Sequence, residues 1–157
     1  MRGFVDAHYV VERDYHQYNI NNAGVGLEVA EPPPGLVDCA GRLEDTFSVA
    51  LLKLIQDRGY GDAEVYKRAG IDRRHFSKIR SNEGYSPAKR TVLALAVALK
   101  LTLDETRALL GRAGYSLSRS MLFDVIIEYF ITNRRYDIIE INDALYHFEQ
   151  VALVGVE

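Results

Sequence analysis

The chain has 157 residues, 48% of them hydrophobic, and its 19 basic and 22 acidic residues give a formal net charge of −3. No apolar run approaches the ~20 residues of a membrane-spanning helix, and the first residues lack the pattern of a signal peptide, so we expect a cytoplasmic protein without a membrane partner. Cys39 is the only cysteine and the four histidines show no zinc spacing with it, so we expect no metal and no cofactor.

The charge is unevenly distributed along the chain. Residues 1–45 contain three basic and eight acidic residues, a balance of −5, whereas residues 61–90 contain eight basic and four acidic residues, a balance of +4. A basic cluster of this kind is typical of a nucleic-acid interface, and the alternative is a solvated helical face without any polyanion.

Residues 1–45 are predicted to form an extended acidic arm followed by a proline-rich linker. The sequence HYVVERDYHQYNI, which begins at His8, suits a strand, NNAG is a plausible turn, and VGLEV could be a second strand. EPPPG then favours an extended linker, and the segment shows no helical signal. Because a lone hairpin is marginal in water, we expect the arm to pair with another chain.

From Thr46 onward helical signals replace strand signals, and residues 46–114 are predicted to hold five helices. The first has an apolar stripe that begins at Phe47. Ser86 is expected to cap the fourth helix, with Pro87 at its first position.

The fifth helix begins with a capping box. Thr102 and Glu105 have the required spacing, and Gly114 is expected to end the helix.

The second and third helices form the pattern of a helix-turn-helix, DAEVYKRAGIDRRHFSKIR, over 62–80. Gly70 can take the left-handed conformation that ends the first helix of the pair, and the Asp72 carboxylate can cap the next one. Phe76 and Ile79 are expected to bury one side of that helix, so its basic side faces outward, as a DNA groove requires. The outward residues are Arg73, Arg74, Ser77, Lys78 and Arg80.

The sequences AGIDRRHFSKI and ALAVALKLTLDETRALL resemble the Cro/C1-type (lambda repressor-like) DNA-binding family over about residues 46–114. The resemblance implies that four residues face the major groove: Arg73, Arg74, Ser77 and Lys78. It also implies that Lys89 and Arg90 contact phosphates. Two positions depart from the family pattern: Asp62 replaces the usual glutamine, and Tyr66 replaces a small residue, so the helix pair is expected to be wider or tilted.

A second resemblance covers about residues 46–150. The run from TFSVALLKLI to LFDVIIEYFI is similar to an all-helical module at the C-termini of bacterial multidomain proteins, including some macro-domain proteins. This resemblance implies a docking or adaptor module as readily as a DNA reader.

Residues 115–157 are predicted to form a C-terminal helical extension of two helices. The first has an apolar stripe from Phe123 to Ile131, and the second, DIIEINDALYHF, has a possible capping box of Asp137 and Glu140. The second stripe consists of Ile138, Ile141, Leu145 and Phe148. These faces either enlarge the core or form a dimer face, because helix-turn-helix proteins bind two-fold sites as dimers.

Catalytic residues are not evident from the sequence. Ser77, His75 and Asp72 lie on one short helix and its cap, where residues two apart do not face each other, so we expect a protein that is not an enzyme.

The sequence therefore predicts an all-α, lambda repressor-like helix-turn-helix bundle with two extra C-terminal helices and an N-terminal β-like arm. The leading functional hypothesis is a small bacterial regulator that binds double-stranded DNA as a homo-oligomer, assembled through the arm or the C-terminal helices. The alternative is a protein-interaction or adaptor module of the same fold that does not read DNA. If the basic residues form one exposed surface without ion pairs, the DNA-binding hypothesis is favoured. If acids such as Asp62 and Glu64 neutralise that surface, the adaptor hypothesis is favoured. The residues of that surface would be Arg73, Arg74, Lys78, Lys89 and Arg90.

Overall fold

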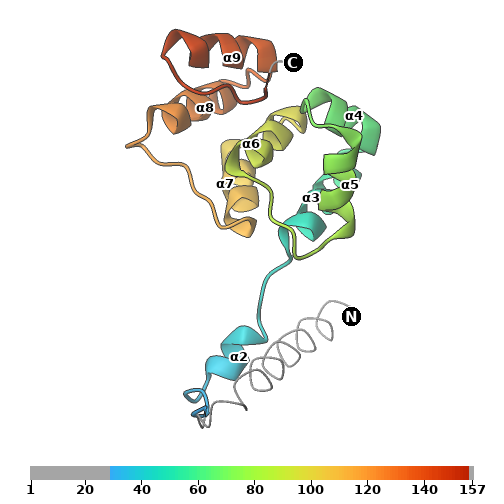
Figure 1. Cartoon of the computed structure of the whole chain (residues 1–157), viewed down its shortest axis with the longest axis vertical. Coiled ribbons are helices and arrows are strands. Elements are labelled where there is room, and N and C mark those ends of the chain that lie inside the picture. Colours follow the sequence, from blue (N-terminus) through green and yellow to red (C-terminus); the bar gives the residue numbers. More distant parts are fainter. Residues whose placement is uncertain (1–28, 156–157) are drawn as a thin grey trace. The chain divides into compact units, whose positions relative to one another are not determined.

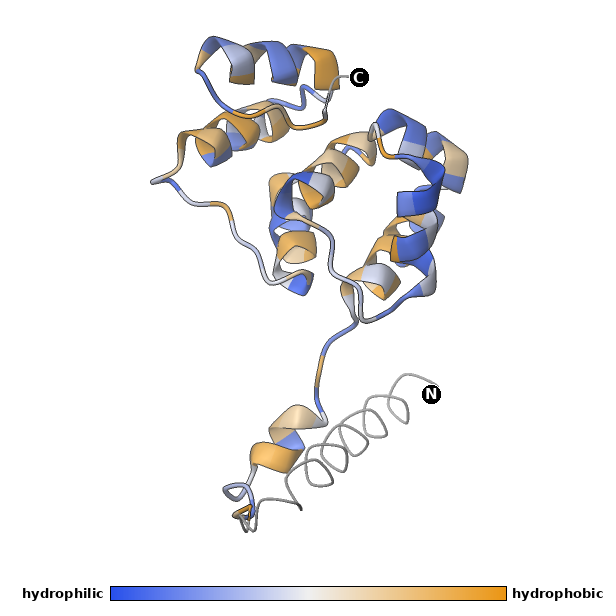
Figure 2. Cartoon of the chain, viewed as in Figure 1, coloured by the Kyte–Doolittle hydropathy of each residue, from blue (hydrophilic) through white to orange (hydrophobic). Residues whose placement is uncertain are grey.

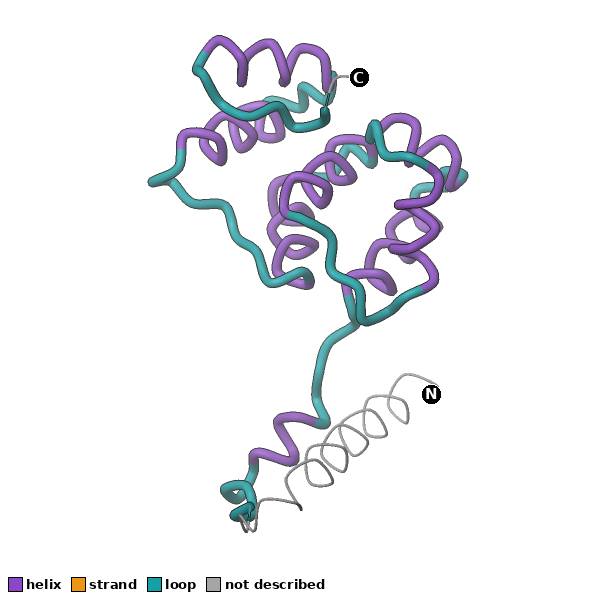
Figure 3. Tube along the Cα trace, in the orientation of Figure 1, coloured by secondary structure: helices purple, strands orange, loops and turns teal. Residues whose placement is uncertain are grey.

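The computed structural model describes residues 29–155, and within this range the chain is all-helical and contains no strand (Figures 1 and 3). The helices in that range are α2 (Leu36–Ala40), α3 (Phe47–Asp57), α4 (Asp62–Arg68), α5 (Arg73–Ser81), α6 (Lys89–Ala98), α7 (Leu103–Arg112), α8 (Leu122–Thr132) and α9 (Ile138–His147). The predicted all-α class and the seven helices predicted after Thr46 are confirmed. The β-like strands predicted for the arm lie almost entirely at residues 8–28, outside the described residues.

The chain divides into two compact units between Asp45 and Thr46. The described part of the first unit contains α2, where the sequence analysis predicted only an extended linker, and this part of the prediction is wrong. Gly35 turns the chain in the left-handed conformation, with φ +86°, directly after the prolines, and Leu36 N donates to Pro33 O at 3.2 Å. A five-residue helix with no buried residue has no apolar stripe by which the sequence could reveal it.

Three of the predicted helix starts are confirmed by side-chain caps. Thr46 accepts from Val49 N at 3.4 Å at the start of α3, and Asp72 accepts from His75 N at 2.8 Å at the start of α5. At α7 both halves of the predicted capping box are formed, because Thr102 and Glu105 each accept a hydrogen bond from the other's backbone N–H. These caps satisfy backbone donors that would otherwise have no partner at a helix start.

One predicted cap, at Ser86, is wrong, and the capping box predicted for α9 is only half formed, because Ser86 and Glu140 each use a different partner. Ser86 Oγ donates to Ala113 O at 3.2 Å, so it does not cap α6, which begins only at Lys89. Glu140 pairs with Arg135, and Asp137 alone caps α9 by accepting from Ile139 N at 2.9 Å.

The core of the second unit is organised around α6, whose residues 92–98 are all buried. Figure 2 shows the hydropathy of this helix and its neighbours. This helix packs against α4 and α7, while α3 contacts both α5 and α7. The two C-terminal helices belong to the same compact unit, and most of their predicted stripe residues join the same hydrophobic cluster. Those stripes therefore enlarge the core; Phe148, which is half exposed, is the exception. Between residues 29 and 155, no helix has the length and apolar character needed to cross a membrane.

Candidate nucleic-acid interface

The turn between α4 and α5 has the geometry that its sequence predicted. Gly70 has φ +66°, in the left-handed region, and follows directly after the end of α4. Ile71 N then donates to Tyr66 O at 2.9 Å, which satisfies a carbonyl of the last turn of α4. Asp72 begins α5 as its cap. Local sequence chemistry therefore fixes where α4 ends and where α5 starts.

Helix α5 has one buried face and one exposed face, as predicted. Phe76 and Ile79 are buried, and the Phe76 ring lies 5.6 Å from the Tyr66 ring, centroid to centroid, in a tilted arrangement. Tyr66, the bulky residue expected to widen the helix pair, is thus half-buried against α5. The five residues predicted to face outward are all exposed: Arg73, Arg74, Ser77, Lys78 and Arg80.

Three cations on α5 form one surface. Arg73 and Arg74 make no ion pair within the described range, and Lys78 Nζ lies 4.6 Å from the centre of the Tyr85 ring. A shallow hollow is lined by these three cations together with the cap Asp72, His75 and Tyr85. The arrangement leaves two guanidinium groups and one ammonium group available to an anionic partner.

Arg80, the last of these five residues, forms an ion pair with Asp62 at the start of α4. Arg68, at the end of α4, pairs with Glu64 at 2.7 Å. The acids named by the sequence analysis therefore neutralise part of the basic cluster, although Arg80 remains more than half exposed.

Lys89, predicted to contact phosphate, is held inside the protein. Its Nζ lies 2.7 Å from Asp124 Oδ2, and the lysine side chain is 23% exposed while that of Asp124 is 1% exposed. The same carboxylate oxygen accepts from Ser118 N at 2.7 Å. Because Asp124 is fully buried in α8, Lys89 is its counter-ion, and the structure does not place it with the α5 cations.

Arg90 is exposed, but its guanidinium is engaged by the C-terminal tail, which we define as residues 152–155. Nη1 of Arg90 donates to Ala152 O at 3.0 Å. Asn142 of α9 holds the tail on its other side, since its Oδ1 accepts from Leu153 N at 2.8 Å and its Nδ2 donates to Val154 O at 3.3 Å. The tail also lines a small hollow together with Gly70 and the start of α5.

The seven predicted contact residues thus fall into a group of four without an ion pair in the part of the chain that the structure describes and a group of three that are engaged within the protein. Arg73, Arg74, Ser77 and Lys78 share the exposed face of α5, whereas Arg80, Lys89 and Arg90 each have a partner within the protein. Sequence reasoning missed Tyr85, whose hydroxyl lies 3.3 Å from His75 Nε2. Tyr85 contacts both His75 and Lys78, and the three-residue spacing of these two puts them on the same side of α5. That shared side was the only signal in the sequence for a contact there.

No protein-family model, no curated protein and no solved structure matches this chain.

Proposed function

We propose that this chain is a small bacterial regulator that binds double-stranded DNA through α5, as the second helix of a lambda repressor-like helix-turn-helix. The observation that carries this proposal is the free cationic face of α5, which follows a left-handed turn at Gly70 and a capped start at Asp72. The bases would be contacted by Arg73, Arg74, Ser77 and Lys78. Arg and Lys donate to the O6 and N7 atoms of guanine in the major groove, while a serine hydroxyl can pair with several bases.

The number of free cations sets how strongly binding depends on salt. Each phosphate neutralised by a cation contributes about −0.9 to the slope of log K against log salt concentration. If the three free cations on α5 act alone, the slope should be about −3. If Arg80, Lys89 and Arg90 also neutralise phosphates, the slope should steepen to about −5. A shallow slope therefore supports binding by α5 without rearrangement of the C-terminal helices.

The test is a fluorescence-anisotropy titration of the full chain against random duplex DNA over a series of salt concentrations. The double substitution Arg73→Ala and Lys78→Ala should weaken binding and flatten any sequence preference. Arg119→Ala, in the loop between α7 and α8, is the matched control because it removes an 85% exposed cation from outside α5. Failure of the wild-type chain to bind duplex DNA even at low salt rules out the proposal.

A second candidate function is a protein-interaction module of the same fold. It is favoured by the loss of two of the five cations, Lys89 and Arg90, from the predicted basic surface. It is also favoured by apolar residues exposed on α8 and α9 and in the segments next to them, which are Met121, Leu122, Val125, Tyr129, Ile139, Tyr146, Phe148 and Val151. If the chain does not bind DNA but assembles in light scattering, this candidate replaces the first.

A further inference from the structure

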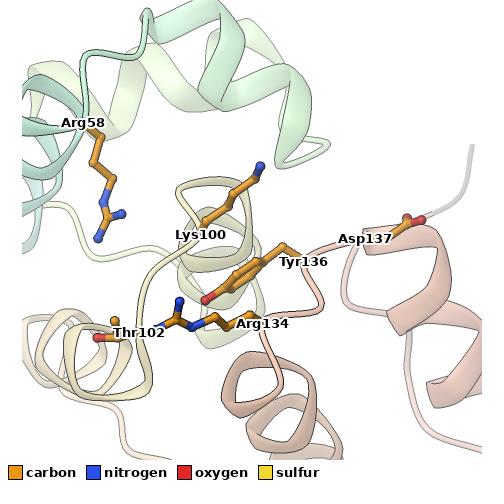
Figure 4. Close-up of a pocket in the computed structure, with 6 residues that line it drawn as sticks. All are labelled: Arg58, Lys100, Thr102, Arg134, Tyr136 and Asp137. Atoms are coloured by element: carbon orange, nitrogen blue, oxygen red, sulfur yellow. The ribbon is translucent and has the colours of Figure 1, made fainter.

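A basic pocket lies apart from α5, where three segments distant in sequence meet. It is lined by the residue that ends α3, by the loop between α6 and α7, and by the loop between α8 and α9 (Figure 4). The lining residues are Arg58, Lys100, Thr102, Arg134, Tyr136 and Asp137. Neither the helix-turn-helix motif nor the proposed DNA contact uses this pocket.

Two guanidinium groups point into the same space. Figure 4 shows the side chains of Arg58 and Arg134 directed toward the region beside the Tyr136 hydroxyl, while the ammonium of Lys100 points away from them. Arg58 uses one nitrogen to bind Glu105 Oε2 at 2.5 Å, which fixes the side chain and leaves its other N–H groups available. Arg134 has no ion pair within residues 29–155. Its guanidinium is a donor group without an acceptor there.

Two acids near the pocket, Glu105 and Asp137, each have a hydrogen-bond donor within the protein. Glu105 is bound to Arg58 and closes the capping box of α7, and the Asp137 carboxylate caps α9 by accepting from Ile139 N. In Figure 4 Asp137 points away from the two guanidinium groups. Three cations, Arg58, Lys100 and Arg134, stand against the two carboxylates Asp137 and Glu105, so the pocket keeps a net charge of +1.

The remaining lining groups are neutral and fixed. Tyr136 donates its hydroxyl hydrogen to Leu101 O at 2.7 Å, and burial raises the pKa of Tyr136, which keeps the hydroxyl protonated. Thr102 Oγ1 accepts from Glu105 N at 3.2 Å, and the Thr102 side chain also hydrogen-bonds to the Glu105 carboxyl, so both residues are fixed. The pocket thus has a fixed aromatic wall in addition to its cations.

The backbone of the pocket is unusual as well. Lys100 and Arg134 have φ +52° and +55°, in the left-handed position after a helix where glycine is the common residue. Helices α3, α4 and α7 of this chain have glycine at the equivalent position. A side chain in this conformation costs stability, and residues of this kind cluster at functional sites. Glu149 has the same conformation after α9 but does not line the pocket, so it provides a matched control.

We propose that this pocket binds the phosphate group of a small soluble phosphate ester, with Arg58 and Arg134 as its principal ligands. A guanidinium donates two parallel N–H groups to two oxygens of a phosphate, and two such groups from opposite sides match a tetrahedral dianion better than they match a single carboxylate. The Tyr136 ring bounds the site. The pocket would give the protein a ligand site separate from the DNA-binding face.

The experiment is an NMR titration of the ¹⁵N-labelled full chain with inorganic phosphate, at an ionic strength held constant with chloride. Saturable shifts are expected at the backbone amides of Lys100, Thr102 and Tyr136. Arg134→Gly removes the cation and also relieves the left-handed strain, so this variant should melt at the same or a higher temperature and yet bind phosphate at least ~10-fold more weakly, because a hydrogen bond to a charged group contributes about 1.5–3 kcal/mol.

Glu149→Gly is the matched control, because it relieves the same backbone conformation outside the pocket and should leave phosphate affinity unchanged. The proposal is overturned if phosphate produces no saturable shift at the pocket, or if Arg134→Gly binds phosphate as tightly as the wild type. A parallel titration with a short DNA duplex separates the two sources of phosphate. If the duplex shifts the pocket amides and inorganic phosphate does not, the pocket belongs to a nucleic-acid surface and the proposal fails.

Discussion

Val154 lies against Gly70, so the C-terminal tail covers the turn between α4 and α5. A methyl group placed on Gly70 would lie 2.5 Å from Val154 Cγ1, well inside van der Waals contact. Gly70 also has φ +66°, so two independent reasons require glycine at this position.

The first prediction follows from this contact. Gly70→Val should lower the free energy of unfolding by about 1–3 kcal/mol, because a β-branched side chain is strained in the left-handed region and also collides with Val154. Urea denaturation followed by circular dichroism measures the loss.

A double-mutant cycle separates the collision from the backbone strain. Gly70→Ala should cost less in a Val154→Ala background than in the wild type, with a coupling of about 0.5 kcal/mol or more, since only the collision is relieved. Additive effects of the two substitutions would show that the tail does not rest on the turn.

The second prediction concerns the ion pair between Lys89 and Asp124. Lys89→Met should lower the free energy of unfolding by about 3–5 kcal/mol, because it leaves a buried carboxylate without its counter-ion. Adding Asp124→Asn should recover much of the loss, since the amide oxygen can still accept from Ser118 N. Arg107→Met is a control that breaks a 3.5 Å pair with Glu128 and should cost less than ~1 kcal/mol, because the arginine is half exposed. An equally small effect of Lys89→Met would mean that the lysine is not required as a counter-ion.

The third prediction is a pH dependence of stability. The hydrogen bond from Arg58 holds the pKa of the Glu105 carboxyl below its ordinary value of 4.5, and Thr102 also lowers it. Because the pKa is lower in the folded chain than in the unfolded chain, the resulting stabilisation is present above pH 4.5 and is lost as the pH falls through the lowered pKa.

Arg58→Met tests this dependence. The variant should be less stable than the wild type at neutral pH, and the difference should shrink well below pH 4.5. Urea denaturation at both pH values measures the difference, and NMR titration should show a higher Glu105 pKa in the variant. A stability difference that is the same at both pH values would argue against the ion pair as its cause.

The fourth prediction concerns assembly through the arm. Deleting residues 1–35 should leave the second unit folded, since the residues from Thr46 form a compact unit of their own. If the arm pairs with another chain, the deletion should lower the mass per assembly in light scattering. Equal masses for the truncated and full-length chains would remove the arm from the assembly interface.

The helices after Thr46 were predictable because their signals are local. Apolar periodicity, the Asp72 cap and the Thr102 capping box all depend on residues within a few positions of each other, and the structure has each of them. The capping-box rule failed where another residue nearby could bind the same side chain. Glu140 pairs with Arg135, five residues away, although its spacing from Asp137 suits a capping box.

The state of the candidate site was less predictable because it depends on partners that are distant in sequence. Asp124 lies 35 residues from Lys89, and the carbonyl that binds Arg90 lies 62 residues away. No periodicity or motif near Lys89 or Arg90 indicates these contacts, so both residues look like free phosphate ligands in the sequence. The exposed face of α5 was predictable because its position follows directly from the burial of Phe76 and Ile79.

The hydrogen bonds between Asn142 and the C-terminal tail also restrict which substitutions this chain can accept during evolution. Asn142 holds Leu153 and Val154 with both ends of its amide, and Val154 occupies the space that a side chain at position 70 would need. Positions 70 and 154 therefore share one small volume, and Asn142 holds the tail backbone that places Val154 there. In related sequences we expect a side chain to replace Gly70 only together with a smaller residue at position 154, and we expect both positions to vary more freely wherever the asparagine at position 142 has been lost.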